Sequence, residues 1–235
     1  TQFCEMTEAQ RSLYEEKKSE LRNFIIDNTE GKAPNNTIYQ HVFKALTQLR
    51  LIASHPSMYA QNAEFESGKF MDVVMNMENL YKEGHKVIIF SNFVKHLKLF
   101  ANFLDDYSLK YSWLTGSVKP EDRLKQINQF QNDPETKFFL ISIKAGGTGI
   151  NLTEADYVFI LDPWFNPAVE NQAIARAHRI GQKKNVMAYK YITLDTVEEK
   201  ILKLQERKSL LAGVLISESQ FFKSLSMDEI KELLE

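Results

Sequence analysis

The feature that most constrains the fold is a regular alternation, from residue 70 onward, between short apolar runs and segments with helix-start signals. Runs such as VIIF, FFLISI and YVFIL are apolar at nearly every position, which is typical of strands buried on both faces of a parallel sheet. We therefore predict an α/β fold in which a mostly parallel sheet is covered by helices on both faces. The predicted strands lie at 87–90, 111–114, 138–143, 157–161 and 186–192.

Helix-start signals fall between these runs. Proline at the first helical position, followed by acids, predicts a helix opening at Pro120. Asn166 followed by Pro167 predicts another, with the asparagine as cap. Thr196 and Glu199 have the spacing of a capping box. Two more helices are predicted near residues 70–82 and 96–105.

The first fifty residues predict helices alone. Thr7 and Gln10 form a capping-box pattern before one helix, and a second helix runs from about Ile38 to Ser54 after the polar loop EGKAPNNT. We expect three parts: a helical extension over 1–66, the α/β lobe over 67–212 and a helical tail over 213–235.

Composition excludes several classes of protein. A net charge of −2 leaves no global attraction to nucleic acid, so DNA binding must come from local basic surface. Cys4 is the only cysteine, which excludes an internal disulfide and fits an intracellular protein. No apolar run approaches the roughly 18 residues of a membrane span, and no leader is evident. Because the chain starts with Thr1 and not Met, we expect it to be part of a longer protein.

Four loops follow the predicted strands, where parallel sheets bind their ligands. Three of them carry small hydroxyl or glycine residues that allow close approach to phosphate oxygens. Each loop alone is weak evidence, because Ser-Asn and Thr-Gly are ordinary turn formers and Asn166-Pro167 is explained as a helix start. Trp164 is more often a core residue than a ligand platform. Their coincidence at successive strand ends favours a binding site. The loops are 91–93, 115–117, 144–149 and 162–166.

The segment QAIARAHRIGQ, residues 172–182, predicts an anion-binding helix face. Gln172, Arg176 and Arg179 are spaced i, i+4 and i+7, which places them on one face of a continuous helix. No acid lies between Glu170 and Asp195 to neutralise the two guanidiniums, which bind phosphate oxygens in a fork. The alternative is a solvated basic face paired with distant acids.

The chain nevertheless lacks a complete nucleotide-hydrolysis site. The glycine loop at Gly146 to Gly149 is followed by Ile150 and Asn151, whereas a phosphate loop needs GxxxxGK[ST]. No Asp-Glu pair follows an apolar strand, so a magnesium-binding acid and a general base are missing as well. We predict no metal-binding residue here. The chain therefore offers arginines that can stabilise negative charge, but no loop that can hold the phosphates.

Several segments together resemble the second motor lobe of the Swi/Snf-type ATPases, the double-stranded DNA translocases of helicase superfamily two. The segments are KVIIFSNF, LTGS, SIKAGGTGINLTEADYV, DPWFNPAVENQAIARAHRIGQ and DTVEEKIL, in this order. The resemblance extends upstream through MTEAQRSLYEE and LTQLRLIASHPSMY, and downstream to SLSMDEIKELL, so it covers nearly the whole chain.

The resemblance implies a RecA-like lobe that closes over ATP together with a first lobe of the same polypeptide. That first lobe would hold the phosphate loop and Mg²⁺. Arg176 and Arg179 would be arginine fingers, with Gln172 as their polar partner, and Gly149 and Asn151 would face the nucleotide. The loops along the DNA backbone would contribute Ser91, Thr115, Gly116, Lys144, Gly146, Gly147 and Thr148.

The resemblance also implies binding partners, and this sequence departs from the family pattern at one position. Double-stranded DNA and a protein cargo of unknown identity are expected, and the fragment alone should not hydrolyse ATP. Ile143 stands where relatives often carry a hydroxyl residue, which puts a phosphate contact there in doubt. His178 lies about 200° from Arg176 around a helix, so we expect it to pack and not to catalyse. The compact sheet suggests a bacterial or archaeal, cytoplasmic protein, or a nuclear one in a eukaryote.

Two other classes of function stay open. A doubly wound small-molecule enzyme would need an acid to meet a ribose roughly 20 residues after its glycines, and only Asp162 and Glu170 lie near that position. A non-catalytic interaction module would use the N-terminal helices to hold a partner, which is also compatible with a motor.

Overall fold

The computed structural model describes residues 1–29, 36–60, 65–146, 150–164, 167–177, 185–209 and 225–234. The chain divides into two compact units, which are described separately. The sheet unit comprises Thr1–Gln2, Asp72–Trp164 and Ala168–Tyr191. The helical unit comprises Phe3–Met71, Phe165–Pro167 and Ile192–Glu235.

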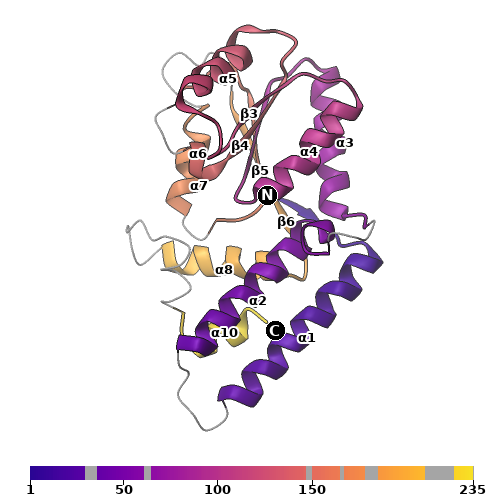
Figure 1. Cartoon of the computed structure of the whole chain (residues 1–235), viewed down its shortest axis with the longest axis vertical. Helices are drawn as coiled ribbons and strands as arrows, with labels where there is room; N and C mark the ends of the chain where they lie inside the picture. The colour runs from indigo at the N-terminus through magenta and orange to yellow at the C-terminus, as the bar shows by residue number, and fades with distance from the viewer. Residues whose placement is uncertain are drawn as a thin grey trace. The chain divides into compact units, whose positions relative to one another are not determined.

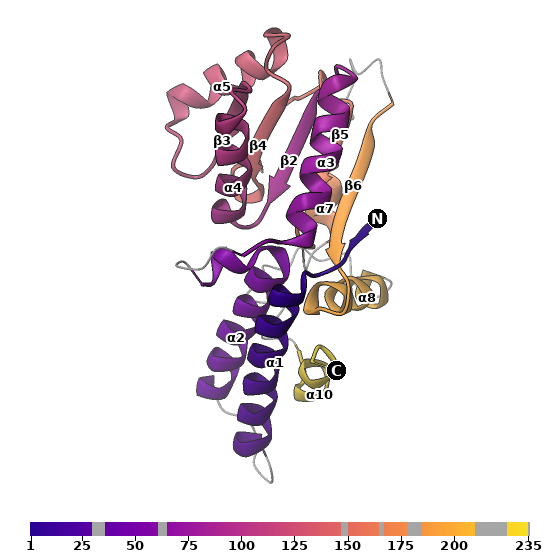
Figure 2. The same ribbon diagram turned by 90° about the vertical axis from the view of Figure 1, so that its right-hand side faces the viewer.

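The sheet confirms the predicted α/β class. Its strand order is β1-β6-β5-β2-β4-β3, and the pairs from β6 to β3 are all parallel. The strands are seen side by side in Figure 2. Their bounds are β1 Gln2–Cys4, β2 Val87–Ser91, β3 Tyr111–Leu114, β4 Phe138–Ser142, β5 Tyr157–Ile160 and β6 Met187–Thr193. All but β1 were predicted, and no end of these five strands differs from its prediction by more than one residue.

Helices cover both faces of this sheet, as predicted. Parallel strands are joined by right-handed crossovers, so the direction of each step along the sheet decides which face its helix covers. The step from β2 to β3 runs opposite to the later steps, and α4 therefore lies with α3 on one face while α5, α6 and α7 lie on the other (Figure 1). The helices are α3 Gly68–Lys82, α4 Val94–Asp106, α5 Pro120–Asn132, α6 Ile143–Gly146 and α7 Pro167–Ile174.

The core explains why the strands read as continuous apolar runs. Every residue of β2 and β4 is buried. Ile88 and Phe90 point to the face covered by α5 to α7, where they meet Phe139 and Ile141 of β4. The intervening residues face α3 and α4, because successive side chains alternate across a strand. Both sides of each strand are thus removed from water.

Gly84 terminates α3. Its φ of 83° lies in the left-handed region that favours glycine. The Gly84 N–H donates to Tyr81 O at 3.0 Å, and the His85 N–H donates to Leu80 O at 2.9 Å. These two bonds form a Schellman motif, which satisfies the last carbonyls of the helix and turns the chain into β2.

The helical unit contains both N-terminal helices, α1 Glu8–Thr29 and α2 Asn36–Ser54. The described part of this unit also contains the 3₁₀ turn η1 Pro56–Met58 and the helices α8 Val197–Ser209 and α10 Met227–Glu232. The boundary expected at residue 212 lies outside the described residues, so the division into 1–66, 67–212 and 213–235 stays a prediction.

The capping box predicted at Thr7 is only half formed. Thr7 Oγ1 accepts the Gln10 N–H at 3.2 Å, as expected of a cap. The Gln10 side chain does not return to Thr7. Its Nε2 donates to Ile52 O at 2.8 Å and to Ala53 O at 3.0 Å, near the end of α2. These carbonyls lack partners within their own helix, so a buried amide satisfies them and joins α1 to α2.

A fully buried ion pair lies in the helical unit. Lys69 Nζ binds Glu198 Oε2, and both side chains are 0% exposed. Glu198 also accepts the Ser54 hydroxyl at 3.0 Å and the Thr193 N–H at 3.0 Å. The carboxylate thus connects α2, α3, β6 and α8, and each of its oxygens has a donor.

We expect Lys69→Met to lower the free energy of unfolding by about 3–5 kcal/mol, because Glu198 is then a buried charge without its cation. Urea denaturation of the 235-residue chain measures this. Lys125→Met is the matched control, since Lys125 is 75% exposed in its pair with Asp122 and such pairs contribute about 0–1 kcal/mol. Equal losses in the two variants would contradict the assignment.

Candidate functional site

The carboxyl ends of four strands are level along one edge of the sheet. Ser91 pairs with Ser142, Leu114 with Ile141, and Phe90 with Ile160. The loops after β2, β3, β4 and β5 therefore leave the sheet at the same edge, as the sequence predicted.

A buried carboxylate joins two of these loops. Asp162 is 0% exposed and follows β5. Its Oδ2 accepts the Ser91 hydroxyl at 2.5 Å, and its Oδ1 accepts the Asn92 N–H at 3.0 Å and the Asn92 side-chain amide at 2.5 Å. The Ser91 hydroxyl also accepts the Phe93 N–H at 3.0 Å. The turn after β2 is thus held in one conformation by the loop after β5.

This arrangement gives Ser91 a structural task. Its side chain is fully buried, and its hydroxyl proton is directed at Asp162. A contact between Ser91 and DNA stays a prediction, and its hydroxyl would have to leave Asp162 to donate to a phosphate. The neighbouring Asn92 is only partly buried.

The other predicted DNA residues differ in accessibility. Thr115 is buried, with its hydroxyl 2.9 Å from that of Ser117. Gly116 is exposed, and a Cβ atom built there would meet nothing within 4 Å. Lys144 is exposed on α6, whereas its neighbour Ile143 is 4% exposed and belongs to the core.

The glycine loop is only partly described. Gly146 is the last residue of α6. The remaining predicted residues of this loop, Gly147, Thr148 and Gly149, lie outside the described residues.

The predicted continuous helix from Gln172 through Arg179 is wrong at Arg176. Helix α7 ends at Ile174, and a turn follows. The Arg176 N–H donates to Ala173 O at 3.2 Å and the Ala177 N–H to Ile174 O at 3.1 Å, so the bonds now span three residues and tighten the chain. Arg179 and His178 lie outside the described residues.

A long-range hydrogen bond lies just beyond this helix end. The Leu152 N–H donates to Arg176 O at 3.0 Å, and this carbonyl would otherwise accept a bond from within a continuing helix. Gln172 and Asn151 are both exposed, but Arg176 is only 7% exposed. The bond brings the segment after the glycine loop against the end of α7, which joins two motifs that the sequence separates by 24 residues (176 minus 152).

Comparison with known proteins decides the family. The profile described as the helicase conserved C-terminal domain matches residues 69–181. The SWI2/SNF2 ATPase C-terminal domain of Sulfolobus solfataricus is 30% identical, with a TM-score of 0.80 over 99% of this chain and 96% of that one. The chain belongs to the SWI2/SNF2 ATPase family. It forms the RecA-like C-terminal lobe of such an ATPase.

Other SWI2/SNF2 structures and sequences agree. The Sulfolobus solfataricus SWI2/SNF2 ATPase core in complex with double-stranded DNA is 31% identical, with a TM-score of 0.82 over 99% of this chain and 49% of that one. The DNA repair protein rad8 of Schizosaccharomyces pombe is 43% identical over 153 residues, which are 65% of this chain and 14% of the relative. An uncharacterized ATP-dependent helicase of Mycoplasma pneumoniae is 32% identical over 99% of this chain and 22% of the relative. The chain thus spans only 14% and 22% of these two relatives.

Two buried acids of this SWI2/SNF2 lobe were not identified as site residues from the sequence. Asp162 and Glu170 were considered only as candidate ribose ligands, and Glu170 also as the last acid before a basic stretch. Both are buried and bound to protein donors, which removes support from the small-molecule enzyme. Lys190, which lies in the acid-free interval between Glu170 and Asp195, is paired with Glu170. The signal that could have identified Asp162 is an acid that closely follows a buried strand.

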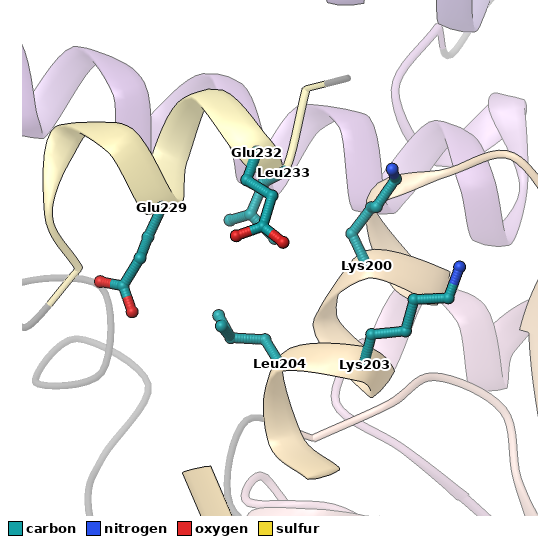
Figure 3. Close-up of a pocket in the computed structure, with 6 residues that line it drawn as sticks. All are labelled: Lys200, Lys203, Leu204, Glu229, Glu232 and Leu233. Atoms are coloured by element: carbon teal, nitrogen blue, oxygen red, sulfur yellow. The ribbon is translucent and has the colours of Figure 1, made fainter. Parts of the chain in front are cut away.

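The lobe also has a small surface hollow, in the helical unit. Figure 3 shows two lysines from α8 and two glutamates from α10 around two leucines. None of the predicted site residues lines it; the lining residues are Lys200, Lys203, Leu204, Glu229, Glu232 and Leu233. Its mixed charges are typical of a solvated contact between two helices.

Metal and membrane features were searched in the described part of the chain. Within those ranges, no three His, Cys, Asp or Glu side chains are grouped so that they can bind a metal ion together. Among the same residues, no helix has both the length and the apolar character needed to cross a membrane.

We expect Asp162→Asn to lower the free energy of unfolding by about 2–3 kcal/mol, because an amide loses the charge and turns a donor toward other donors. Urea denaturation measures the loss, and hydrogen exchange should show faster exchange at Asn92. Asp106→Asn, at an exposed acid of α4, is the control and should change stability by less than about 0.5 kcal/mol. Similar exchange in the two variants would show that Asp162 does not hold this turn.

Proposed function

We propose that the chain is the C-terminal motor half of an ATP-driven translocase on double-stranded DNA. The observation that carries this proposal is the single sheet edge where the loops after four strands emerge, with Leu152 bonded to Arg176. An edge of this kind is where parallel sheets bind phosphate-bearing ligands. The DNA-bound core of the Sulfolobus relative supports the choice of duplex DNA.

In this proposal the lobe completes an ATP site that it does not build alone. A first lobe of the same polypeptide holds ATP and Mg²⁺, and Arg176 and Arg179 stabilise the negative charge that develops on the γ-phosphate. Gln172, Gly149 and Asn151 line the nucleotide. The 7% exposure of Arg176 supports this role, because a guanidinium held in place before the reaction needs little reorganisation during it.

The same edge grips DNA through its backbone. The proposed contacts offer glycines, hydroxyls and one lysine, which suit phosphates and do not read bases. Closing and opening of the two lobes once per ATP would shift this grip along one strand. The proposed residues are Ser91, Thr115, Gly116, Lys144, Gly146, Gly147 and Thr148.

Partners and compartment follow from this activity. The first lobe is the obligatory partner, and a protein cargo, whose identity is unknown, would be carried or displaced along the duplex. A DNA motor acts where the chromosome lies, which is the cytoplasm of a bacterium or archaeon and the nucleus of a eukaryote.

We expect Lys144→Ala to weaken duplex binding equally on all sequences and to reduce the slope of log K against log salt by about 1, since one phosphate contact is lost. Titration of the chain on duplexes of several sequences at several salt concentrations tests this. Lys137→Ala is the matched control, because Lys137 precedes β4 at its amino end whereas Lys144 follows its carboxyl end. A larger effect of Lys137→Ala would place the DNA surface elsewhere.

In the full-length protein, Arg179→Ala should lower DNA-stimulated ATP turnover by roughly 10³-fold or more while nucleotide binding is retained, as for other arginine fingers. Arg176→Lys should also be damaging, because an ammonium cannot replace the guanidinium fork. The isolated chain should show no ATP turnover, and steady-state phosphate release measures all three expectations.

His178→Ala is the contrast in the same segment, and we expect it to affect stability more than turnover. If Arg179→Ala keeps near-normal turnover, or if the isolated chain hydrolyses ATP after further purification, the finger assignment is wrong.

A further inference from the structure

Glu170 is a buried acid with a task beyond starting a helix. It lies in the first turn of α7 and is 2% exposed. Its Oε1 accepts the backbone N–H of Trp164 at 2.6 Å, and its Oε2 is paired with Lys190 Nζ of β6. One carboxylate thus connects the turn after β5, the helix α7 and the strand β6, all within the sheet unit.

The helix that Glu170 anchors ends just before Arg176. Helix α7 ends at Ile174, about one turn after Glu170. Arg176 follows in the next turn, and its carbonyl is bonded to Leu152. Apolar packing of Ala173, Val169 and Ile174 holds α7 against the core, and Glu170 adds directed polar contacts at its first turn. Because a helix of eight residues is short and hydrogen-bonded along its length, a shift of its first turn is passed on to its last.

We propose that Glu170 is a positioning residue, which fixes α7 and thereby holds the Arg176 segment in the place where it meets the nucleotide. This inference rests on the proposed function, since it takes Arg176 to act on ATP. Glu170 touches neither ATP nor DNA in this proposal. It acts through the helix that it anchors.

Stability alone does not explain a charge at this site. Replacing a buried ion pair by apolar residues of similar volume is often neutral or stabilising, so such a pair is weak evidence for a stabilising role. A carboxylate with two directed partners does, however, define where its helix lies. Burial raises the pKa of Glu170, while Lys190 and the Trp164 N–H oppose that rise and the nearby Asp162 adds to it. Among the groups around this carboxyl, Lys190 favours its charged form most strongly.

The test is Glu170→Gln in the full-length protein. Glutamine keeps an oxygen for the Trp164 N–H but loses the charge that pairs with Lys190. We expect kcat for DNA-stimulated ATP hydrolysis to fall about 10- to 100-fold, as for small displacements of catalytic groups, with KM for ATP changed less than about twofold. Lys190→Met should lower kcat in the same way. Lys190→Arg keeps the ion pair with Glu170 and should retain most of the wild-type turnover.

A readout independent of ATP is the Leu152 amide. Because its N–H is bonded to Arg176 O, hydrogen exchange at Leu152 reports the position of the Arg176 segment. Glu170→Gln should accelerate this exchange under conditions in which the amides of β5 and β6 keep their protection. Mass spectrometry of a peptide that covers Leu152 measures it in the full-length protein.

Glu199 offers a matched control. It lies in the first turn of α8, pairs with Lys203 at 2.7 Å and accepts the Asp195 N–H at 3.1 Å, so it has the same kinds of partner as Glu170. Glu199→Gln should leave kcat within about twofold of wild type, because α8 carries no proposed catalytic residue.

The outcomes separate this inference from the proposed function. If the wild-type protein lacks DNA-stimulated turnover, the proposed function fails, and Leu152 exchange still decides whether Glu170 positions the segment. If Arg179→Ala abolishes turnover but Glu170→Gln has wild-type kcat and Leu152 exchange, Glu170 is not a positioning residue. A fall in kcat that only follows the folded fraction would likewise overturn the inference.

Discussion

Hydrogen bonding between parallel strands that are buried on both faces is the constraint on which this lobe depends. Strand β2 lies between β4 and β5, and every one of its residues is removed from water. A slip of one residue in either pairing would turn Ile88 and Phe90 away from the core that receives them. The apolar sequence therefore determines the register, and the register brings the functional loops to one edge.

Two buried carboxylates then give this edge its detailed shape. Asp162 holds the turn after β2, and Glu170 holds the start of α7. In the sequence, Asp162 precedes Trp164 and Glu170 follows it. The short segment after β5 therefore shapes both the proposed DNA surface, through Asp162, and the proposed nucleotide surface, through Glu170. Burying these charges is costly, and the donors around each of them offset that cost.

The sequence predicts what local patterns determine and misses what distant contacts decide. The strands from β2 to β6 and the starts of α5 and α7 follow from apolar runs and proline, which act within a few residues. The end of α7 does not, and the Leu152 N–H that binds Arg176 O just beyond it comes from another segment. Asp162 and Ser91 are 71 residues apart, and only the order of strands in the sheet makes them neighbours.

The level strand ends have a consequence for how such a lobe can change over evolutionary time. All of the proposed site residues lie at the carboxyl ends of the strands, so the turns at the amino ends are not constrained by binding or catalysis. The turn 107–110 between α4 and β3 is of this kind, with Tyr107 62% exposed and Ser108 at a φ of 54°. An insertion there would lengthen an exposed loop without moving a strand. New binding modules can be accommodated at that edge while the proposed DNA and nucleotide surfaces stay intact.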